Sequence, residues 1–245
     1  MKIVVIIPSR YESTRFPGKP LAIISQRPMI QMVYERASTA KTVTDVIVAT
    51  DDKRIYDAVI SFNGKAIMTS IENRSGTDRA AEASEKLCLN PNDIIINVQG
   101  DQPLFDPRSL DEVVKPLLLN DPLISMTTLA IKIVRKDEYT NPKDVKVTFD
   151  ANNFALYFSR STIPYDRDNI ISPETYKHLG IYAYTSNFLK IFKNLPTGKL
   201  ETIEKLEQLR AIEYGYKIKV IITTYDSPEV DTPEDICRME TLLHS

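Results

Sequence analysis

Short apolar runs rich in β-branched residues alternate with amphipathic helical patterns along the first half of this 245-residue chain. The apolar runs predict strands at residues 3–7, 46–49, 65–68 and 94–98. The patterns between them predict helices at residues 29–40, 53–62 and 76–87. Strands that are buried on both faces and separated by helices indicate an α/β protein with a mostly parallel, doubly wound sheet. In such a sheet, ligands bind at the carboxyl ends of the strands.

The second half of the chain has a more mixed pattern. Its expected elements are a helix at 110–119, strands at 125–134, 178–185 and 218–226, and a helix at 200–215 that Gly215 ends. Residues 145–160 predict two strands joined by a turn at 150–153. Pro233 is expected to open a last helix, with Asp231 or Thr232 as its cap. Because no linker or repeat separates the halves, the second half is expected to be an insertion built onto the sheet.

Composition excludes several classes of protein. The chain has 31 basic and 33 acidic residues and no basic stripe, which argues against nucleic-acid binding. Its apolar runs are shorter than the ~20 residues of a membrane span, and no secretory signal is visible. The two cysteines, Cys88 and Cys237, lack metal-binding spacing and are expected to be reduced thiols. We therefore expect a cytoplasmic protein without membrane insertion.

The opening stretch VIIPSRYESTRFPGKP places three cations directly after the first strand. Arg10 and Arg15 can each bind a phosphate or carboxylate through paired donors, and Lys19 offers a compact charge. Neither a GxGxxG nor a GxxxxGK[ST] motif is present. The residue types suggest an anion site at the carboxyl edge of the sheet, although a solvated basic loop fits this segment equally well.

Two aspartates follow other strands at the same predicted edge. Asp101 lies in VQGDQP after the strand at 94–98, and Asp231 lies in VDTPED near the end of the chain. If the two loops meet, both carboxylates can hold Mg²⁺, which favours one or two carboxylates together with substrate phosphates. Each aspartate also suits a turn or the start of a helix, and the spacing alone does not decide between these roles.

Three further segments carry candidate binding residues. In NRSGTDR, Ser75 and Thr77 can offer donors to a base or phosphate, or simply begin a helix. In YKHLGIYAY, His178 precedes Tyr182 at a strand start and can reach a sugar, although a lone histidine is more often structural. In the helix expected at 200–215, Glu204 and Gln208 share one face and Glu207 lies one step off it; a solvated face is the default reading.

Eight segments together identify a family. They are MKIVVIIPSRYESTRFPGKPL, ATDD, MTSIENRSGTDR, VQGDQPL, ALYFSRSTIPYDRD, HLGIYAY, LEQLR and VDTPEDI, in this order from end to end. The sequence resembles the CMP-Kdo synthetases, the 3-deoxy-manno-octulosonate (Kdo) cytidylyltransferases. The resemblance implies a Rossmann-like, three-layer nucleotidyltransferase fold. It also implies a homodimeric protein in the cytoplasm. It implies one cytidylyltransferase domain over 1–245, with a nucleotide-binding core at about 1–125 and 216–245 and a sugar-binding and dimerisation region at about 126–215.

The resemblance also implies a Mg²⁺-dependent reaction that serves lipopolysaccharide biosynthesis. CTP and the sugar acid would become the CMP-sugar and pyrophosphate. The implied catalytic residues are Lys19, Asp101 and Asp231, and the two aspartates are the implied metal ligands. The implied nucleotide-binding residues are Pro8, Arg10, Arg15, Lys19, Arg74, Ser75 and Gln99. The implied sugar-binding residues are Arg10, Gln99, Arg160, His178, Tyr182, Glu207 and Gln208.

Two departures from the family pattern bear on the substrate. Arg74 stands where relatives often have Gln, and Gln102 stands where many Kdo-using relatives have Glu. With YKHLGIYAY and the tail YDSPEVDTPEDI, Gln102 is more similar to the branch that activates 8-amino-3,8-dideoxy-manno-octulosonate. Two alternatives stay open: a cytidylyltransferase for another acidic sugar such as a sialic acid, and a catalytically silent nucleotide-binding protein. The presence of both Asp101 and Asp231 argues against the silent protein.

Overall fold

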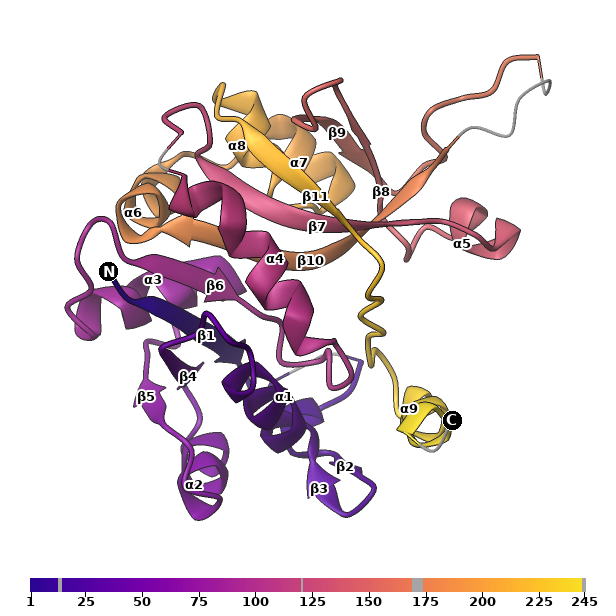
Figure 1. The fold of residues 1–245 in the computed structure, drawn as a ribbon. Coiled ribbons are helices and arrows are strands. Elements are labelled where there is room, and N and C mark those ends of the chain that lie inside the picture. The colour runs from indigo at the N-terminus through magenta and orange to yellow at the C-terminus, as the bar shows by residue number, and fades with distance from the viewer. Residues whose placement is uncertain (13–14, 120, 169–173, 244–245) are drawn as a thin grey trace.

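Four parallel strands from the first half of the chain form one half of the central sheet (Figure 1): β1 (Ile3–Ser9), β4 (Asp45–Thr50), β5 (Ala66–Met68) and β6 (Ile94–Asn97). The computed structural model describes residues 1–12, 15–119, 121–168 and 174–243. β1 is buried along its whole length, and its Val5 pairs with Val46 of β4 and Ile96 of β6. The chain adds β4 and β5 on one side of β1 and then returns to form β6 on the other. This reversal creates a switch point at the carboxyl ends of β1 and β6, where open parallel sheets bind ligands.

The second half of the chain extends the same sheet with β7 (Met126–Lys132), β8 (Lys146–Phe149), β9 (Ala155–Ser159), β10 (Tyr176–Thr185) and β11 (Ile218–Thr223). The strand order is β11-β7-β10-β6-β1-β4-β5, with β8 and β9 attached at β10. β10 runs antiparallel to β6 and β7, whereas β11 pairs in parallel with β7. The mostly parallel α/β fold predicted from the sequence is confirmed. The division into a core and an inserted region stays a prediction.

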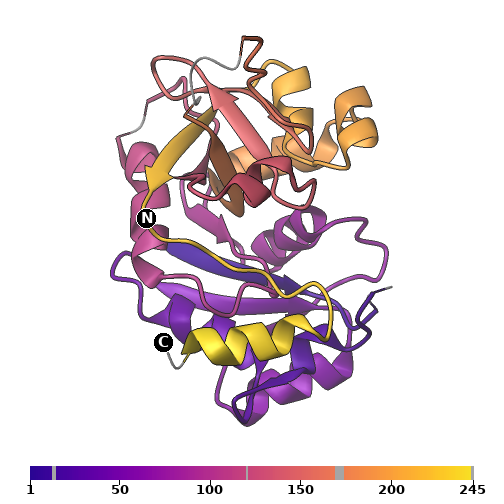
Figure 2. The same ribbon diagram turned by 90° about the vertical axis from the view of Figure 1, so that its right-hand side faces the viewer.

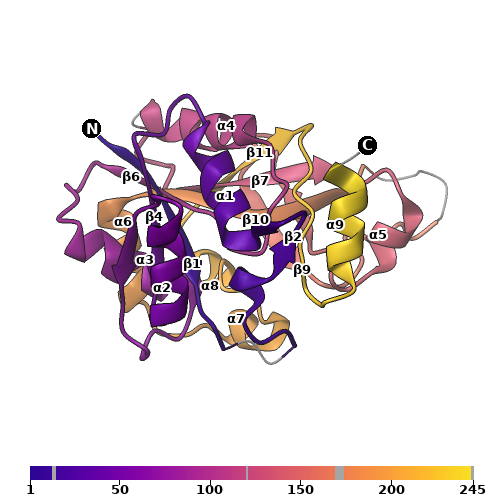
Figure 3. The same cartoon turned by 90° about the horizontal axis from the view of Figure 1, so that it is seen from below.

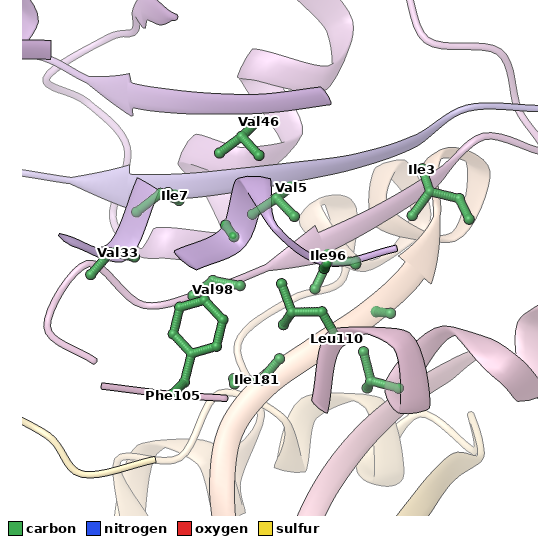
Figure 4. Packing of buried hydrophobic residues seen from close by; sticks show 14 of the residues in the cluster. Ile3, Val5, Ile7, Val33, Val46, Ile96, Val98, Phe105, Leu110 and Ile181 are labelled. Carbon is green, nitrogen blue, oxygen red and sulfur yellow. The ribbon is translucent and has the colours of Figure 1, made fainter. Parts of the chain in front are cut away.

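Helices cover both faces of this sheet and complete a three-layer arrangement (Figure 2). One hydrophobic cluster includes α1 (Met29–Ser38), α2 (Lys53–Ser61) and α4 (Pro107–Leu118); the other includes α3 (Gly76–Lys86), α6 (Ser186–Asn194) and α8 (Leu209–Glu213). Figure 4 shows the first cluster, in which Val33 of α1 and Leu110 of α4 pack with the strand residues Val5 and Ile96. Each such buried aliphatic side chain contributes about 1.5–3 kcal/mol. None of the helices in the described ranges is long and apolar enough to cross a membrane.

The hairpin predicted at residues 145–160 is confirmed. β8 and β9 pair antiparallel, and the Asp150 carboxylate accepts hydrogen bonds from the backbone N–H groups of Asn152 and Phe154. Asn153 adopts a left-handed conformation with φ 57°, which an asparagine tolerates well in a turn. The short helix α5 (Lys136–Thr140) precedes this hairpin.

The prediction of a single helix at 200–215 is wrong. The segment forms α7 (Lys199–Glu204) and α8, separated by Lys205 in a left-handed conformation with φ 55°. Long-range hydrogen bonds accompany the break: the Glu204 carboxylate accepts from Ser159 Oγ, and the Glu207 carboxylate accepts from Ser75 Oγ. Glu204 and Gln208 therefore do not share one helical face. Gly215, with φ 79°, follows the end of α8 as predicted.

An extended strap, residues 224–234, leads from β11 to the last helix, α9 (Asp235–Leu243), as Figure 3 shows. α9 packs its buried Met239 in a small cluster with Met29 and with Ile24 of β2 (Ile23–Ile24), the partner of β3 (Arg27–Pro28). The helix begins two residues after the predicted Pro233. The Asp235 carboxylate accepts from the backbone N–H groups of Asp231 and Thr232, and the Asp231 carboxylate pairs with Arg15.

Candidate active site

A polar pocket of about 270 Å³ lies at the switch point of the sheet. It contains eight of the predicted site residues: Pro8, Arg10, Arg15, Lys19, Arg74, Ser75, Gln99 and Asp101. They come from the end of β1, the opening loop, the start of α3 and the loop after β6. The predicted anion-binding loop thus faces the predicted carboxylate loop across one hollow.

A tight turn aims Lys19 across this pocket. Gly18 adopts a left-handed conformation with φ 72°, and its backbone N–H donates to Tyr11 O at 2.9 Å. A short 3-10 helix, η1 (Lys19–Leu21), starts directly after it. Lys19 Nζ donates to Asp101 Oδ2 at 2.5 Å and to Val230 O at 3.0 Å. The ammonium group therefore bridges the loop after β6 and the C-terminal strap.

The two predicted metal carboxylates lie on segments that are hydrogen-bonded to each other. The backbone N–H of Val230 donates to Asp101 O at 2.9 Å. Asp101 pairs with Lys19, and Asp231 Oδ1 pairs with an Arg15 guanidinium nitrogen at 3.1 Å. Each carboxylate is thus paired with a cationic side chain, whose place beside the carboxylate a metal ion could take. No group of three or more His, Cys, Asp or Glu side chains suited to a metal occurs among the described residues, so a metal here would need substrate oxygens as well.

Sequence reasoning missed a third carboxylate, Glu229, beside this pair. The buried Gln102 donates through Nε2 to Leu179 O at 2.7 Å and to Glu229 Oε1 at 3.1 Å. The protein atoms around the Glu229 carboxyl and the charges of Asp101 and Asp231 raise its pKa, although Glu229 as a whole is exposed to solvent. The position within the Asp231 motif was the available signal for Glu229.

Glu207 anchors the start of α3 at the edge of the pocket. Its two carboxylate oxygens accept hydrogen bonds from Ser75 Oγ and Thr77 Oγ1, both at 2.7 Å. Ser75 Oγ also accepts the backbone N–H of Asp78 as the N-cap of α3. Desolvation by the surrounding protein raises the pKa of Glu207. The Ser75 hydroxyl is therefore already committed to Glu207, whereas exposed Arg74, paired with Asp78 at 3.2 Å, keeps donors for a ligand.

His178 and Tyr182 form an aromatic group on β10. Their ring centroids lie 5.2 Å apart, and the Phe158 ring lies 5.0 Å from that of His178. Thr128 Oγ1 donates to Ile181 O, so the 2.9 Å contact with His178 Nε2 requires the histidine nitrogen to be the donor. Desolvation lowers the pKa of His178 to about 3 and raises the pKa of Tyr182. The histidine is therefore neutral, with Nδ1 free of the proton.

The remaining predicted sugar residues do not line the pocket. Arg160 donates to Glu204 O at 2.9 Å and to Pro142 O at 3.0 Å. Gln208 is buried, and its Nε2 has no hydrogen-bond partner within the described ranges. The predicted sugar-binding role of Arg160 and Gln208 stays a prediction.

Three pocket residues had no individual signal in the sequence. Ser9 Oγ is buried without a hydrogen-bond partner in the described structure. Gly100 has no room for a side chain, because a Cβ there would lie 2.8 Å from Ser9 Oγ. Buried Arg79 donates to Thr69 Oγ1 at 2.6 Å and to Asp51 Oδ2 at 2.7 Å. Asp51 lies in the ATDD segment and Arg79 in RSGTDR, so membership of two separate family segments was the only signal for these residues.

Comparison with known proteins shows the family of this chain. Residues 4–218 match the model of the cytidylyltransferase family. A 3-deoxy-manno-octulosonate cytidylyltransferase of Desulfatibacillum aliphaticivorans is 63% identical over 99% of both chains. An 8-amino-3,8-dideoxy-manno-octulosonate cytidylyltransferase of Shewanella baltica is 55% identical over 99% of both chains. A solved CMP:2-keto-3-deoxy-manno-octonic acid synthetase complexed with CTP superposes with a TM-score of 0.92, at 42% identity and over 100% of this chain and 99% of that one. The chain belongs to the cytidylyltransferase family.

Proposed function

We propose that this protein transfers the cytidylyl group of CTP to the anomeric hydroxyl of a 3-deoxy-manno-octulosonate sugar and releases pyrophosphate. The CMP-sugar that it forms would serve lipopolysaccharide biosynthesis. Relatives named for Kdo and for its 8-amino analogue both match this chain over nearly its full length. The sugar is therefore one of these two. The preference for the 8-amino sugar stays a prediction, since among the described residues the Gln102 side chain bonds only to Leu179 O and Glu229.

The observation that carries the proposal is the pocket where Arg10, Arg15 and Lys19 face Asp101. Both substrates are anions, so an enzyme that joins them must neutralise their charge. Guanidinium groups bind phosphate oxygens through paired donors, and an ammonium group stabilises charge on a leaving phosphate. The cations can bind a triphosphate and the carboxylate can bind a divalent ion. The pocket therefore suits the two ligands together better than it suits only one of them.

Asp101 and Asp231 would hold Mg²⁺. Their fit rests on the donor set: two carboxylates on adjoining segments, each balanced by a cation that a divalent ion could replace. Mg²⁺ would supply charge neutralisation of the phosphates and a lower pKa for the attacking sugar hydroxyl. The protein contributes position and charge, and no protein nucleophile is needed.

The residues of the pocket then have distinct tasks. Lys19, released from Asp101, can follow the charge that develops on the departing pyrophosphate. Arg10 and Arg15 hold the triphosphate, and the Ser9 hydroxyl, which has no partner among the described residues, can donate to a substrate oxygen. Gln99 lies between nucleotide and sugar. Holding both reactants in line converts a bimolecular step into an effectively unimolecular one.

The sugar would lie on the β10 side of the pocket. Neutral His178 can accept a hydrogen bond from a sugar hydroxyl at Nδ1, because its proton is on Nε2 and is donated to Thr128 Oγ1. The Tyr182 ring lies beside that of His178, and Glu207, Arg160 and Gln208 complete the proposed sugar contacts. Glu207 acts mainly by fixing Ser75 and Thr77.

We also propose a cytoplasmic homodimer. The hairpin β8–β9 and the segment after it expose Leu156 and Tyr165, at 59% and 81% of their surface. Exposed apolar side chains on a projecting hairpin suit an interface between two copies. Dependence on CTP supports a cytoplasmic location.

A panel assay tests the proposal. Pyrophosphate release is measured with CTP and Mg²⁺ and one of three sugars: Kdo, 8-amino-Kdo or a sialic acid. Turnover with one or both octulosonates and little with the sialic acid is expected. Turnover only with the sialic acid would establish the other acidic-sugar function. No turnover with any sugar, despite CTP binding, would leave a silent nucleotide-binding protein.

A further inference from the structure

A second cavity, of about 530 Å³, lies between α5, the strap and α9. It shares no lining residue with the active-site pocket. Arg36 of α1, Lys177 of β10, Asp226 of the strap and Arg238 of α9 are among its walls. Figure 1 shows the strap running from β11 down to α9, with α5 beyond it. The volume is that of a typical site for a small metabolite.

The charge lining this cavity is mostly positive, although the whole chain has a formal net charge of -2. Its basic residues are Arg36, Lys132, Arg135, Lys177 and Arg238, and its acidic residues are Glu138 and Asp226. A concave surface lined by one sign of charge concentrates ligands of the opposite sign. The cavity is therefore suited to an anion.

The two acidic residues already have cationic partners. Lys177 Nζ lies 3.0 Å from Glu138 Oε1 and 3.2 Å from Asp226 Oδ1. Glu138 also pairs with Arg135 at 3.1 Å, and Lys132 pairs with Glu174 at 2.5 Å. These ion pairs form one wall and leave no lining carboxylate for the other two cations.

Arg36 and Arg238 are those remaining cations. Arg36 donates to a neutral acceptor, Phe105 O, at 3.3 Å, and burial lowers the pKa of its guanidinium. The Arg238 side chain makes no hydrogen bond or ion pair with any residue that the structure describes. A guanidinium fork matches the oxygens of a phosphate group. Beside these cations the cavity is walled by Leu104, Ile131 and Pro228.

We propose that this cavity binds a small phosphomonoester with an apolar body. The phosphate lies on Arg36 and Arg238, and the body packs against Leu104, Ile131 and Pro228. An inorganic anion would use only the guanidinium groups, whereas the ester also buries apolar surface.

The strap connects this cavity to the active site. Asp226 and Pro228 line the cavity, while Val230 O accepts from Lys19 and Asp231 pairs with Arg15. A ligand that holds Asp226 and Pro228 in place would also restrain the next residues of the strap. Occupancy of the cavity is therefore expected to slow backbone hydrogen exchange in residues 224–231.

Calorimetric titration with phenyl phosphate tests the proposal on the full chain. CTP and Mg²⁺ are present and the sugar is omitted, so that the active-site pocket is filled. Arg238→Ser is expected to weaken phenyl phosphate binding about 10-fold or more, the usual effect of removing one charge-assisted hydrogen bond. Lys115→Ser, which removes an exposed cation of α4 outside the cavity, is expected to bind like the unmodified protein.

Several results would overturn the proposal. These are absence of binding to the unmodified protein, equal binding by Arg238→Ser, equal weakening by Lys115→Ser, and binding of inorganic phosphate as tight as that of phenyl phosphate. Arg238 is exposed and unpaired in the described structure, so Arg238→Ser is expected to fold and to keep its pyrophosphate-releasing activity. Unchanged hydrogen exchange at 224–231 in the phenyl phosphate complex would overturn the coupling through the strap.

Discussion

The nucleotide side and the sugar side of the candidate site use polar residues in different ways. On the nucleotide side, Lys19 pairs with Asp101 in the wall of an open pocket, and Arg15 of the same pocket pairs with Asp231 on the adjoining strap. On the sugar side, the Glu207 carboxylate accepts hydrogen bonds from the hydroxyls of Ser75 and Thr77, both at 2.7 Å. The first arrangement can exchange its partners when a ligand arrives, whereas the second fixes the shape of the protein.

This difference predicts two classes of variant. Changes on the nucleotide side should reduce turnover while the protein stays folded, because its ion pairs are partly exposed and such pairs contribute little to stability. Changes on the sugar side should reduce stability and affinity together, because they leave desolvated donors or acceptors without partners.

Loss of a metal carboxylate should have the largest effect. Asp101→Asn or Asp231→Asn is expected to lower turnover about 100-fold or more, since each removes a charge that positions the reacting phosphate. Thermal unfolding should shift little. Pyrophosphate release and a circular dichroism melt measure the two effects, and Asp57→Asn on α2, an exposed partner of Lys53, is the matched control. Full activity in either active-site variant would refute the metal assignment.

Removal of the bridging lysine should come next. Lys19→Ala is expected to lower kcat by about 10- to 100-fold, because the leaving group loses a cation. The same assays apply, with Lys53→Ala on the surface of α2 as the control. If Lys19→Ala lowered only the melting temperature, Lys19 would be a structural link between Asp101 and Val230 O.

Glu207→Gln probes the sugar side. Ser75 and Thr77 donate to different carboxylate oxygens, and the amide keeps only one of these, so the variant should lose about 1–3 kcal/mol of unfolding free energy and bind both substrates more weakly. Urea unfolding and the KM values for CTP and sugar measure this, with exposed Glu72→Gln as the control. Reduced kcat at unchanged stability would instead place Glu207 among the reacting groups.

His178 should give the smallest effect on stability at neutral pH, and that effect should grow as the pH falls. Its pKa is about 3 in the folded protein and about 6.5 when unfolded, so between these values the unfolded state binds the extra proton. The free energy of unfolding therefore falls as pH falls below about 6.5. His178→Phe keeps an aromatic ring but cannot bind the proton. The variant should therefore reduce the slope of unfolding free energy against pH by an amount equivalent to at most one bound proton. An unchanged slope in urea unfolding at pH 5 to 7 would show that His178 is not held neutral.

The sequence was most informative where local pattern decides structure. The buried runs of β1, β4 and β6 follow from β-branched residues, and the placement of Arg10, Lys19 and Asp101 at the strand ends follows from the parallel sheet. Because carboxyl ends of parallel strands meet at one edge, the opening loop and the loop after β6 could be expected to face each other.

Long-range contacts decided the rest. The pattern of residues 200–215 favours one helix, but the chain turns at Lys205, and Glu204 and Glu207 bond to distant segments. The position of Asp231 depends on the path of the strap and its hydrogen bond from Val230 to Asp101, which no local spacing encodes. Ser9 was missed because a serine at the end of a strand has no distinctive pattern.

The central claim is that the opening loop, the loop after β6 and the C-terminal strap form one site for CTP and a divalent metal. Mn²⁺ in place of Mg²⁺ can be titrated by electron paramagnetic resonance with CTP present, against the same solution without protein. We predict that Asp101→Asn and Asp231→Asn each weaken Mn²⁺ binding about 10-fold or more, while Asp57→Asn binds like the unmodified protein. Unchanged Mn²⁺ binding in either active-site variant would contradict the claim.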